Sequence, residues 1–327
     1  MNKLSPAKKH LLAYLIALIF IISALLPNFA HAEPKKVTIG VYVTRLFDTN
    51  LHTDDYSATL WLWFLYHPFD SWGPENNIDF LNSKDVEKLT SASSQAKDGE
   101  IWWQGKYRVM TIADWNVQNY PFDVQNIYLL LEDSMLEASQ LEFIADVKNS
   151  GVALDAISHD WELTSFDIKT APAHTITNFG DPQEKIGSDF SRVTIHLQLK
   201  RANSWTKFIS VFSANFISIL LAFTVTLLPI DNWQARLSLS AASTFVAVGG
   251  RYSLQNLLPY SRHFTLSDKI ELLVFIYIFI VISNSILCGH LHKHHREKAA
   301  RRINETVIIA SILLIPFCNY LFLRNIV

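Results

Sequence analysis

The feature that most constrains the fold is the contrast between an alternating first part of the chain and an apolar last third. After Trp205, four long segments are rich in apolar residues and carry few charges, over residues 205–229, 236–258, 269–291 and 304–324. About 20 mostly apolar residues in a helix are enough to cross the hydrocarbon core of a bilayer. The sequence therefore predicts a transmembrane domain of four helices over residues 203–327.

The first 32 residues have the three parts of a secretory signal peptide. Three lysines among the first nine residues precede an apolar run over residues 11–26, and Ala30-His31-Ala32 offers small residues at a cleavage site. We expect residues 1–32 to be a signal peptide, with an uncleaved N-terminal anchor as the alternative.

The connection between the third and fourth apolar segments indicates the orientation in the membrane. Residues 291–302 carry five lysines and arginines against the single acid Glu297. Cytoplasmic connections are enriched in basic residues, so this one is expected in the cytoplasm. We therefore expect a multi-pass membrane protein, in contact with membrane lipid, with residues 33–202 outside the cytoplasm.

Residues 33–202 show the period of a β-domain. Apolar residues occupy every second position over residues 37–43 and 193–199, which predicts half-buried strands. Residues 60–66 are apolar and aromatic throughout, which predicts a strand buried on both faces. Further strands are expected at residues 105–114, 124–132 and 161–169, with turn-rich breaks at 48–55, 72–77, 91–99 and 170–188. The pattern predicts an all-β, immunoglobulin-like sandwich followed by the four helices.

The second apolar segment differs from the other three because it is rich in small and hydroxyl residues. At spacings of four and three, one helical face carries Ser238, Ala242, Phe245, Gly249 and Tyr252. Such a face lines water or packs against other helices, and the spacing alone leaves both open. Arg236 and Arg251 favour water, because a membrane arginine normally faces an aqueous cavity or a partner.

Composition argues against several other classes of function. The formal net charge of −2 is too small to indicate a nucleic-acid partner. Both cysteines, Cys288 and Cys318, lie in apolar segments, and no motif implies a cofactor or an enzyme. The alternative is a metal-dependent membrane enzyme, for which the ligands would be His290, His292, His294 and His295. A solvated basic connection is the ordinary explanation of these histidines.

Several short motifs occur in an order that is typical of one family. The first two are Trp72-Gly73-Pro74-Glu75 and Tyr120-Pro121-Phe122-Asp123, and Asp160-Trp161, Lys200-Arg201, Gln234-Ala235-Arg236 and Leu257-Leu258-Pro259 follow. Together with the four apolar segments they resemble the pentameric ligand-gated ion channel (Cys-loop receptor) superfamily, in its prokaryotic, disulfide-free branch. Asn119 and Val124 stand where the bridging cysteines of animal members would be. The chain departs from the family in the short interval between Tyr66 and Trp72 and in the first apolar segment, which lacks prolines near its outer end.

The resemblance implies a homopentamer around a pore for inorganic ions. The stripe from Ser238 to Tyr252 would line the pore, and Phe245 would close it as a hydrophobic gate. Gln234 and Arg236 would form the cytoplasmic mouth, where cation-selective relatives carry an acidic ring. Because that ring is missing, we expect anion-selective or poorly selective conduction. A non-conducting receptor of the same architecture is the alternative.

The resemblance also implies how a ligand acts on the pore. Asp123 would pair with Arg201, and the loop containing Pro121 would press on the connection at Pro259. The expected ligand site lies between subunits, and its candidate residues are Trp61, Asn82, Glu132, Asp133 and Phe179. An aromatic cage near carboxylates suits a cationic amine, and protons are a second candidate agonist. The candidate proton sensors are His52, Asp54, Asp55 and His159.

Overall fold

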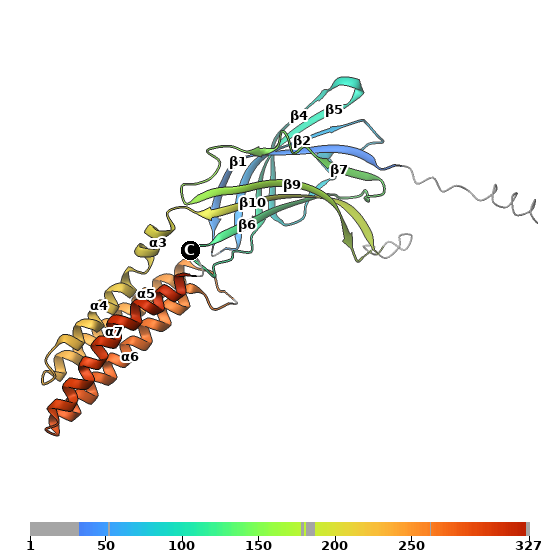
Figure 1. The fold of residues 1–327 in the computed structure, drawn as a ribbon. Helices are drawn as coiled ribbons and strands as arrows, with labels where there is room; N and C mark the ends of the chain where they lie inside the picture. Colours follow the sequence, from blue (N-terminus) through green and yellow to red (C-terminus); the bar gives the residue numbers. More distant parts are fainter. Residues whose placement is uncertain (1–32, 52, 178–179, 181–186, 262, 325–327) are drawn as a thin grey trace, which may run out of the picture.

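The structure is a computed structural model, and it describes residues 33–51, 53–177, 180, 187–261 and 263–324. A β-domain is followed by an elongated bundle of helices that extends from one end of it (Figure 1). The signal peptide expected at residues 1–32 lies outside the described residues.

The larger sheet has six strands. Its order is β4-β5-β2-β1-β7, and the short β8 also pairs with β1. The bounds are β1 Lys35–Asn50, β2 Asp55–Tyr66, β4 Ser83–Gln95, β5 Ile101–Ile112, β7 Leu141–Ala145 and β8 Gly151–Val152. β1 and β2 run antiparallel with Val41 opposite Leu62, as expected for two strands joined by a tight turn.

The smaller sheet has four strands and completes the sandwich. Its order is β3-β6-β10-β9, with bounds β3 Ile78–Phe80, β6 Val124–Asp133, β9 Trp161–Thr175 and β10 Ser188–Arg201. One apolar cluster joins both sheets, and Val41, Leu62, Leu131 and Val193 are all fully buried in it. Two short helices, α2 Pro74–Asn77 and η1 Lys97–Gly99, lie in the connections. The predicted β-sandwich is thus confirmed.

Four details of the strand prediction are wrong. Residues 91–95 belong to β4 and residues 170–175 to β9, so neither segment is part of a break. Residues 48–50 likewise still belong to β1. In residues 60–66 of β2, only every second residue is buried, and Trp61, Trp63 and Leu65 are partly exposed. The strand is therefore buried on one face only. The sequence does not show an alternation of apolar and polar residues here, because the residues on the other face are also large and apolar or aromatic.

Within residues 203–261 and 263–324, which the structure describes, five helices make up the last third of the chain. Their bounds are α3 Ser204–Val211, α4 Ser213–Leu227, α5 Trp233–Leu257, α6 Leu266–Lys293 and α7 Glu297–Arg324. Within the described residues, two helices, α6 and α7, are long and apolar enough to cross a membrane, and α3 with α4 makes a third span if this pair, bent by 51°, is counted as one. Of the four spans predicted, the structure therefore supports two, or three with the bent pair. The helix α5 also lies in the bundle, but its composition is too polar for a candidate membrane span.

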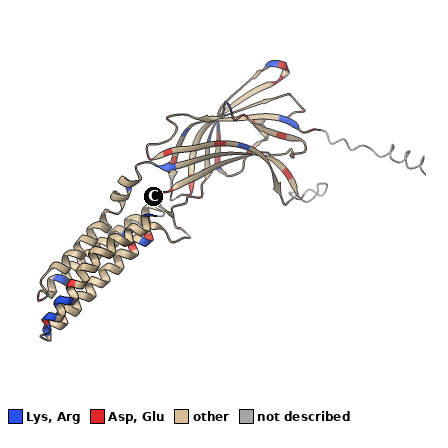
Figure 2. Cartoon of the chain, viewed as in Figure 1, with Lys and Arg blue, Asp and Glu red and all other residues tan. Residues whose placement is uncertain are grey.

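Charge and apolar surface are distributed as a membrane-spanning bundle requires. Basic residues gather at the end of the bundle that lies farthest from the β-domain (Figure 2). On α6 and α7, large apolar side chains such as Phe279, Leu313 and Phe317 are more than half exposed. Such a surface is expected to face lipid rather than water.

Candidate functional site

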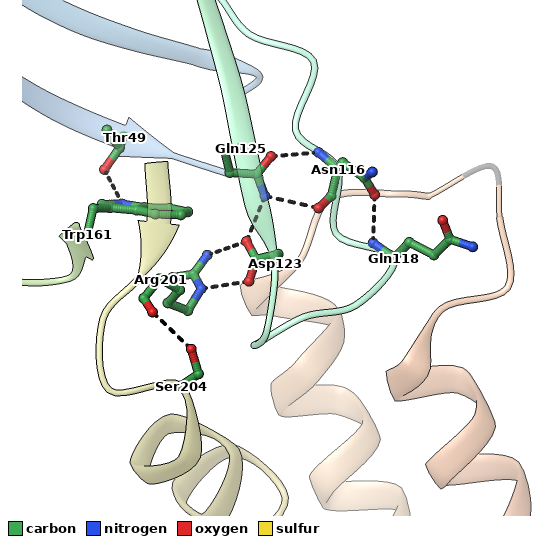
Figure 3. A network of polar contacts seen from close by, with 8 residues as sticks. All are labelled: Thr49, Asn116, Gln118, Asp123, Gln125, Trp161, Arg201 and Ser204. Atoms are coloured by element: carbon green, nitrogen blue, oxygen red, sulfur yellow. Dashed lines mark hydrogen bonds and ion pairs between the residues drawn. The ribbon is translucent and has the colours of Figure 1, made fainter. Parts of the chain in front are cut away.

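Asp123 and Arg201 form a buried ion pair at the junction of the two domains. Arg201 ends β10 and Asp123 directly precedes β6, and the antiparallel pairing of these strands brings the two side chains together. Arg201 Nε donates to Asp123 Oδ1 at 2.8 Å, and Nη2 donates to Oδ2 at 3.0 Å (Figure 3). The side chains are 8% and 1% exposed, so this bidentate pair is screened little by solvent.

The ion pair is part of a larger network. Gln125 Nε2 donates to Asp123 Oδ2 at 2.6 Å and also to the carbonyl of Asn116 (Figure 3). The Arg201 guanidinium lies over the rings of Trp161 and Tyr120, at 4.2 and 4.8 Å from their centroids. Burial raises the pKa of Tyr120, and the positive charge of Arg201 only partly opposes this. The guanidinium is thus held by a carboxylate on one side and by aromatic rings on others.

Sequence reasoning did not single out Gln125, although a signal was present. It lies two residues after Asp123, so both side chains point to the same side of the extended chain. Gln125 is 1% exposed, and its Oε1 accepts from the backbone N–H of Asn116 at 2.9 Å. Its role is to fix Asp123 relative to the preceding loop.

The loop before β6 connects this network to the helices. Its peptide bond between Tyr120 and Pro121 is cis. Phe122 packs against Trp205 and Phe208 of α3, with ring centroids 4.9 and 5.6 Å apart. At the start of α6, the backbone N–H of Leu266 donates to the carbonyl of Gln118 at 2.8 Å. The loop therefore contacts the first helix of the bundle and the beginning of α6 directly.

The connection after α5 lies beside this loop. Val117 of the loop lines one cavity together with Leu258 and Pro259. Leu258 also packs against the apolar clusters of both domains. The structure thus brings together the four residues expected to couple the domains, Pro121, Asp123, Arg201 and Pro259, at one junction.

The helix α5 has two distinct faces. One face is buried in the bundle and contains Ser240, Ser243, Ala247, Gly250 and Leu254. The other is exposed and carries all five residues of the predicted stripe, Ser238, Ala242, Phe245, Gly249 and Tyr252. Phe245 is 78% exposed and Tyr252 is 68% exposed. Within one chain, this stripe is therefore free to meet water or another copy of the chain.

Arg236 does not lie at the mouth of the stripe, and that prediction is wrong. Its side chain is fully buried, and Nη2 donates to Asn304 Oδ1 of α7 at 2.6 Å. The reason is its register, since Arg236 precedes the buried Ser240 by four residues and so shares the inward face of α5. Gln234, the other residue predicted at this mouth, is exposed. Arg251 also has a partner, because its Nη1 lies 3.6 Å from Glu271 Oε2 on α6.

Two of the predicted ligand-binding residues, Asn82 and Glu132, form polar contacts within the β-domain itself. Asn82 bridges to β6, donating to the carbonyl of Tyr128 at 2.7 Å and accepting from the N–H of Leu130 at 3.0 Å. Glu132 is buried and pairs with Arg192 at 2.5 Å. These two side chains hold the strands together.

The other three predicted ligand-binding residues are Asp133, Trp61 and Phe179. Asp133 is 3% exposed and accepts from Trp72 Nε1 at 2.6 Å and from two backbone N–H groups. Trp61 is partly exposed on β2, and the ammonium of Lys106 lies 5.6 Å from its ring centroid. Phe179 lies outside the described residues. The ring of Trp61 therefore already has a cation near it within the chain.

Of the candidate proton sensors, Asp55 has an evident partner. Its carboxylate accepts from Lys84 Nζ at 2.7 Å and from Thr53 Oγ1 at 2.7 Å. Partial burial by itself raises the pKa of Asp55, but the hydrogen bonds from Lys84 and Thr53 and the charge of Lys84 outweigh it, so the pKa is lowered. Asp54 and His159 are exposed, and His52 lies outside the described residues.

The four histidines lie in the last turn of α6 and in the connection to α7. His290 and His294 lie with ring centroids 4.5 Å apart, but no group of three or more potential ligands is arranged around a common point within the described residues.

Comparison with known proteins does not supply a family. No protein-family model matches the sequence, and no curated protein matches it.

Proposed function

We propose that the chain is one subunit of a homopentameric ligand-gated ion channel in a bacterial inner membrane, with its β-domain in the periplasm. The proposal rests on the exposed stripe of α5 and on the order of motifs that resemble the pentameric channels. Inorganic ions are the permeant species, and the stripe lines their path.

The observation that carries the proposal is the position of a polar helix in an otherwise apolar bundle. α6 and α7 are apolar enough to face lipid, whereas α5 is not. Yet α5 exposes one whole face, which includes Ser238 and Gly249 as well as Phe245. Polar side chains and small residues on a membrane helix are expected to face water or another helix. A central pore shared by several copies satisfies this requirement.

Phe245 is the proposed gate. Its ring is 78% exposed and lies at the middle of the stripe, between Ala242 and Gly249. Several phenyl rings around an axis would exclude water from the narrowest part of the pore and stop ions without blocking them sterically. Opening then requires only that the rings move apart or turn away.

Voltage-clamp recording tests this function. We expect Phe245→Ser to give a current in the absence of agonist, because a hydroxyl group allows the constriction to stay wet. Phe279→Ser is the matched control, since Phe279 on α6 is 69% exposed on the outside of the bundle and should not affect the closed state. Surface-expressed Phe245→Ser without any current would count against the pore and favour a non-conducting receptor.

The ion selectivity is proposed to be weak or in favour of anions. Gln234 carries no charge, and Arg236 is turned into the bundle, so neither contributes an exposed charge to the stripe. Rings of charged side chains are what normally sets the sign of the permeant ion. A reversal potential that follows the sodium gradient under asymmetric sodium chloride would contradict this part of the proposal.

The proposed route of activation runs through the junction of the domains. A proton or a small amine acts on the β-domain, and the network of Asp123 and Arg201 passes the change to α3 and α6. Acid steps and a panel of primary amines during the same recordings would distinguish the two agonists. An agonist response that survives in Asp123→Asn at full size would assign the ion pair to stability alone.

A further inference from the structure

The side chain of Asn304 on α7 forms hydrogen bonds with all three of the other long helices in the bundle. Its Oδ1 accepts from Arg236 Nη2 on α5 at 2.6 Å and from Asn284 Nδ2 on α6 at 2.9 Å. Its Nδ2 donates to the carbonyl oxygen of Thr226, in the last turn of α4, at 2.8 Å. Asn304 is 9% exposed, so these bonds lie inside the bundle. One amide group therefore links α4, α5, α6 and α7.

The guanidinium of Arg236 depends on this amide. It is fully buried, and its Nε and Nη1 make no hydrogen bond with any residue that the structure describes. Its partner Asn304 is neutral, and no ion pair of Arg236 with a carboxylate occurs among the described residues. A buried charge that is neither paired nor fully hydrogen-bonded is strongly unfavourable. The amide of Asn304 is therefore the contact that keeps Arg236 inside the bundle.

The register of α5 links the direction of Arg236 to the direction of Phe245. The two residues are nine positions apart in one continuous helix, Trp233–Leu257. At 3.6 residues per turn, nine residues make two and a half turns, so the two side chains point to opposite sides. The burial agrees, since Arg236 is fully buried and Phe245 is 78% exposed. Holding Arg236 inward therefore holds Phe245 outward.

We propose that Asn304 is the positioning residue of α5. Its amide holds Arg236 on the inward face, and the register of the helix then sets the direction of the exposed stripe. Without the amide, we expect the first turns of α5 to open or turn, so that the guanidinium reaches water. A cavity of about 520 Å³, which Asn304 lines together with Arg301 and His292, offers a route beside the connection between α6 and α7. The gating role of Phe245 rests on the proposed function, whereas the positioning of α5 does not.

Hydrogen exchange of the full chain in detergent micelles, measured by mass spectrometry, tests the positioning. In Asn304→Leu, the amides of residues 237–243 should exchange at least about tenfold faster than in the wild type, because α5 opens locally more easily once a bond to a charged group is lost. Asn319→Leu is the matched control on the same helix, since Asn319 Nδ2 donates to the carbonyl of Ile315 in α7 itself at 2.9 Å. It should leave the exchange of α5 unchanged. Unchanged exchange of α5 in Asn304→Leu would overturn the proposal.

A double variant separates positioning from a general loss of stability. Asn304→Leu also removes the bonds to Asn284 and Thr226, and these stay absent when Arg236→Met is added. The double variant leaves no unpaired charge at this place, so the exchange of residues 237–243 should return to within about threefold of the wild type. Persistent fast exchange would overturn the proposal, because it would show that the charge of Arg236 is not what moves α5.

The same pair of variants covers a failure to fold. If Asn304→Leu cannot be purified but the double variant can, that recovery supports the proposal. If neither can be purified, Asn304 is needed for something other than Arg236, and the proposal is overturned.

Voltage-clamp recordings separate this inference from the proposed function. Asn304→Leu should show a larger closed-state current than the wild type, and Asn319→Leu should not. Faster exchange in a chain that never conducts, even as Phe245→Ser, would support the positioning of α5 and count against the channel alone. A current in Phe245→Ser, together with a wild-type closed state and wild-type exchange in Asn304→Leu, would overturn the positioning alone.

Discussion

Replacing Asp123 by alanine should cost the β-domain much of its stability. The change leaves the guanidinium of Arg201, which is 8% exposed, without its bidentate partner. Removing one member of a buried ion pair typically costs about 3–5 kcal/mol, because the remaining charge stays desolvated. The rings of Trp161 and Tyr120 stay in place, and they recover about 0.5–2 kcal/mol at most. We therefore expect a net loss of about 1–4.5 kcal/mol.

Urea unfolding of the full chain in detergent micelles, followed by tryptophan fluorescence, measures this loss. For a denaturant dependence of about 2 kcal/mol per M, the midpoint of the β-domain transition should fall by about 0.5–2 M. Trp161 reports on the site directly, since its ring lies against Arg201. The double variant Asp123→Ala with Arg201→Met should lose less than Asp123→Ala alone, because no unpaired charge remains in the interior.

An exposed pair of the same type is the matched control. Arg108 Nη1 lies 2.7 Å from Glu87 Oε2, and both side chains are more than half exposed. Glu87→Ala should cost no more than about 1 kcal/mol, since water already solvates Arg108. Finding the same small loss for Asp123→Ala would refute the argument that burial makes the pair at the junction important.

Two further predictions concern the β-domain. The lowered pKa of Asp55 means that its pairing with Lys84 contributes stability above the usual value of 3.8, and that this contribution is lost as the pH falls through the folded-state pKa. Lys84→Gln should therefore have a lower urea midpoint than the wild type at neutral pH and the same midpoint well below pH 3.8; a difference that persists in acid would contradict the assignment. Gly40→Ala should destabilise the domain by about 1–3 kcal/mol, because a Cβ there would lie 2.2 Å from the ring of Trp63 and push it away from Asp146, to which it donates at 3.1 Å. Thermal unfolding measures the effect, and a melting temperature equal to that of the wild type would show that the ring moves without loss.

Strands with one buried face were predictable from the sequence, whereas an exposed edge strand was not. The alternation in β1 and β10 appears in the burial of Val41 and Val193, because a sheet with one solvated face imposes that period. In β4, nearly every residue from Ser83 to Gln95 is exposed, so no apolar period could reveal the strand. Its pairing with β5 is decided by tertiary contact rather than by its own composition.

The pairing of Asp123 with Arg201 could be anticipated only through the resemblance, since 78 positions separate the two residues. The failure at Arg236 has a different cause. Of the two environments expected for a membrane arginine, water and a partner, the sequence favoured water, but the side-chain oxygen of Asn304 on another helix accepts a hydrogen bond from Arg236 inside the bundle. A single sequence does not reveal such a partner, because Asn304 lies 68 positions later.

The small residues of α5 pack against another helix on one face, and we propose that those on the opposite face line water. On the buried face, the hydroxyl of Ser243 donates to the carbonyl of Ser218 on α4 at 2.8 Å, and Gly250 allows close approach, since a Cβ there would lie 2.8 Å from Asn215 Oδ1. These contacts hold α5 against α4 and leave the stripe around Phe245 outside the packed interior. A helix that is anchored on one side by small residues can expose a polar stripe on the other without becoming apolar itself. The composition of α5 is too polar for a helix that faces lipid on all sides. This is expected of a helix that faces a pore, and it supports the proposed function.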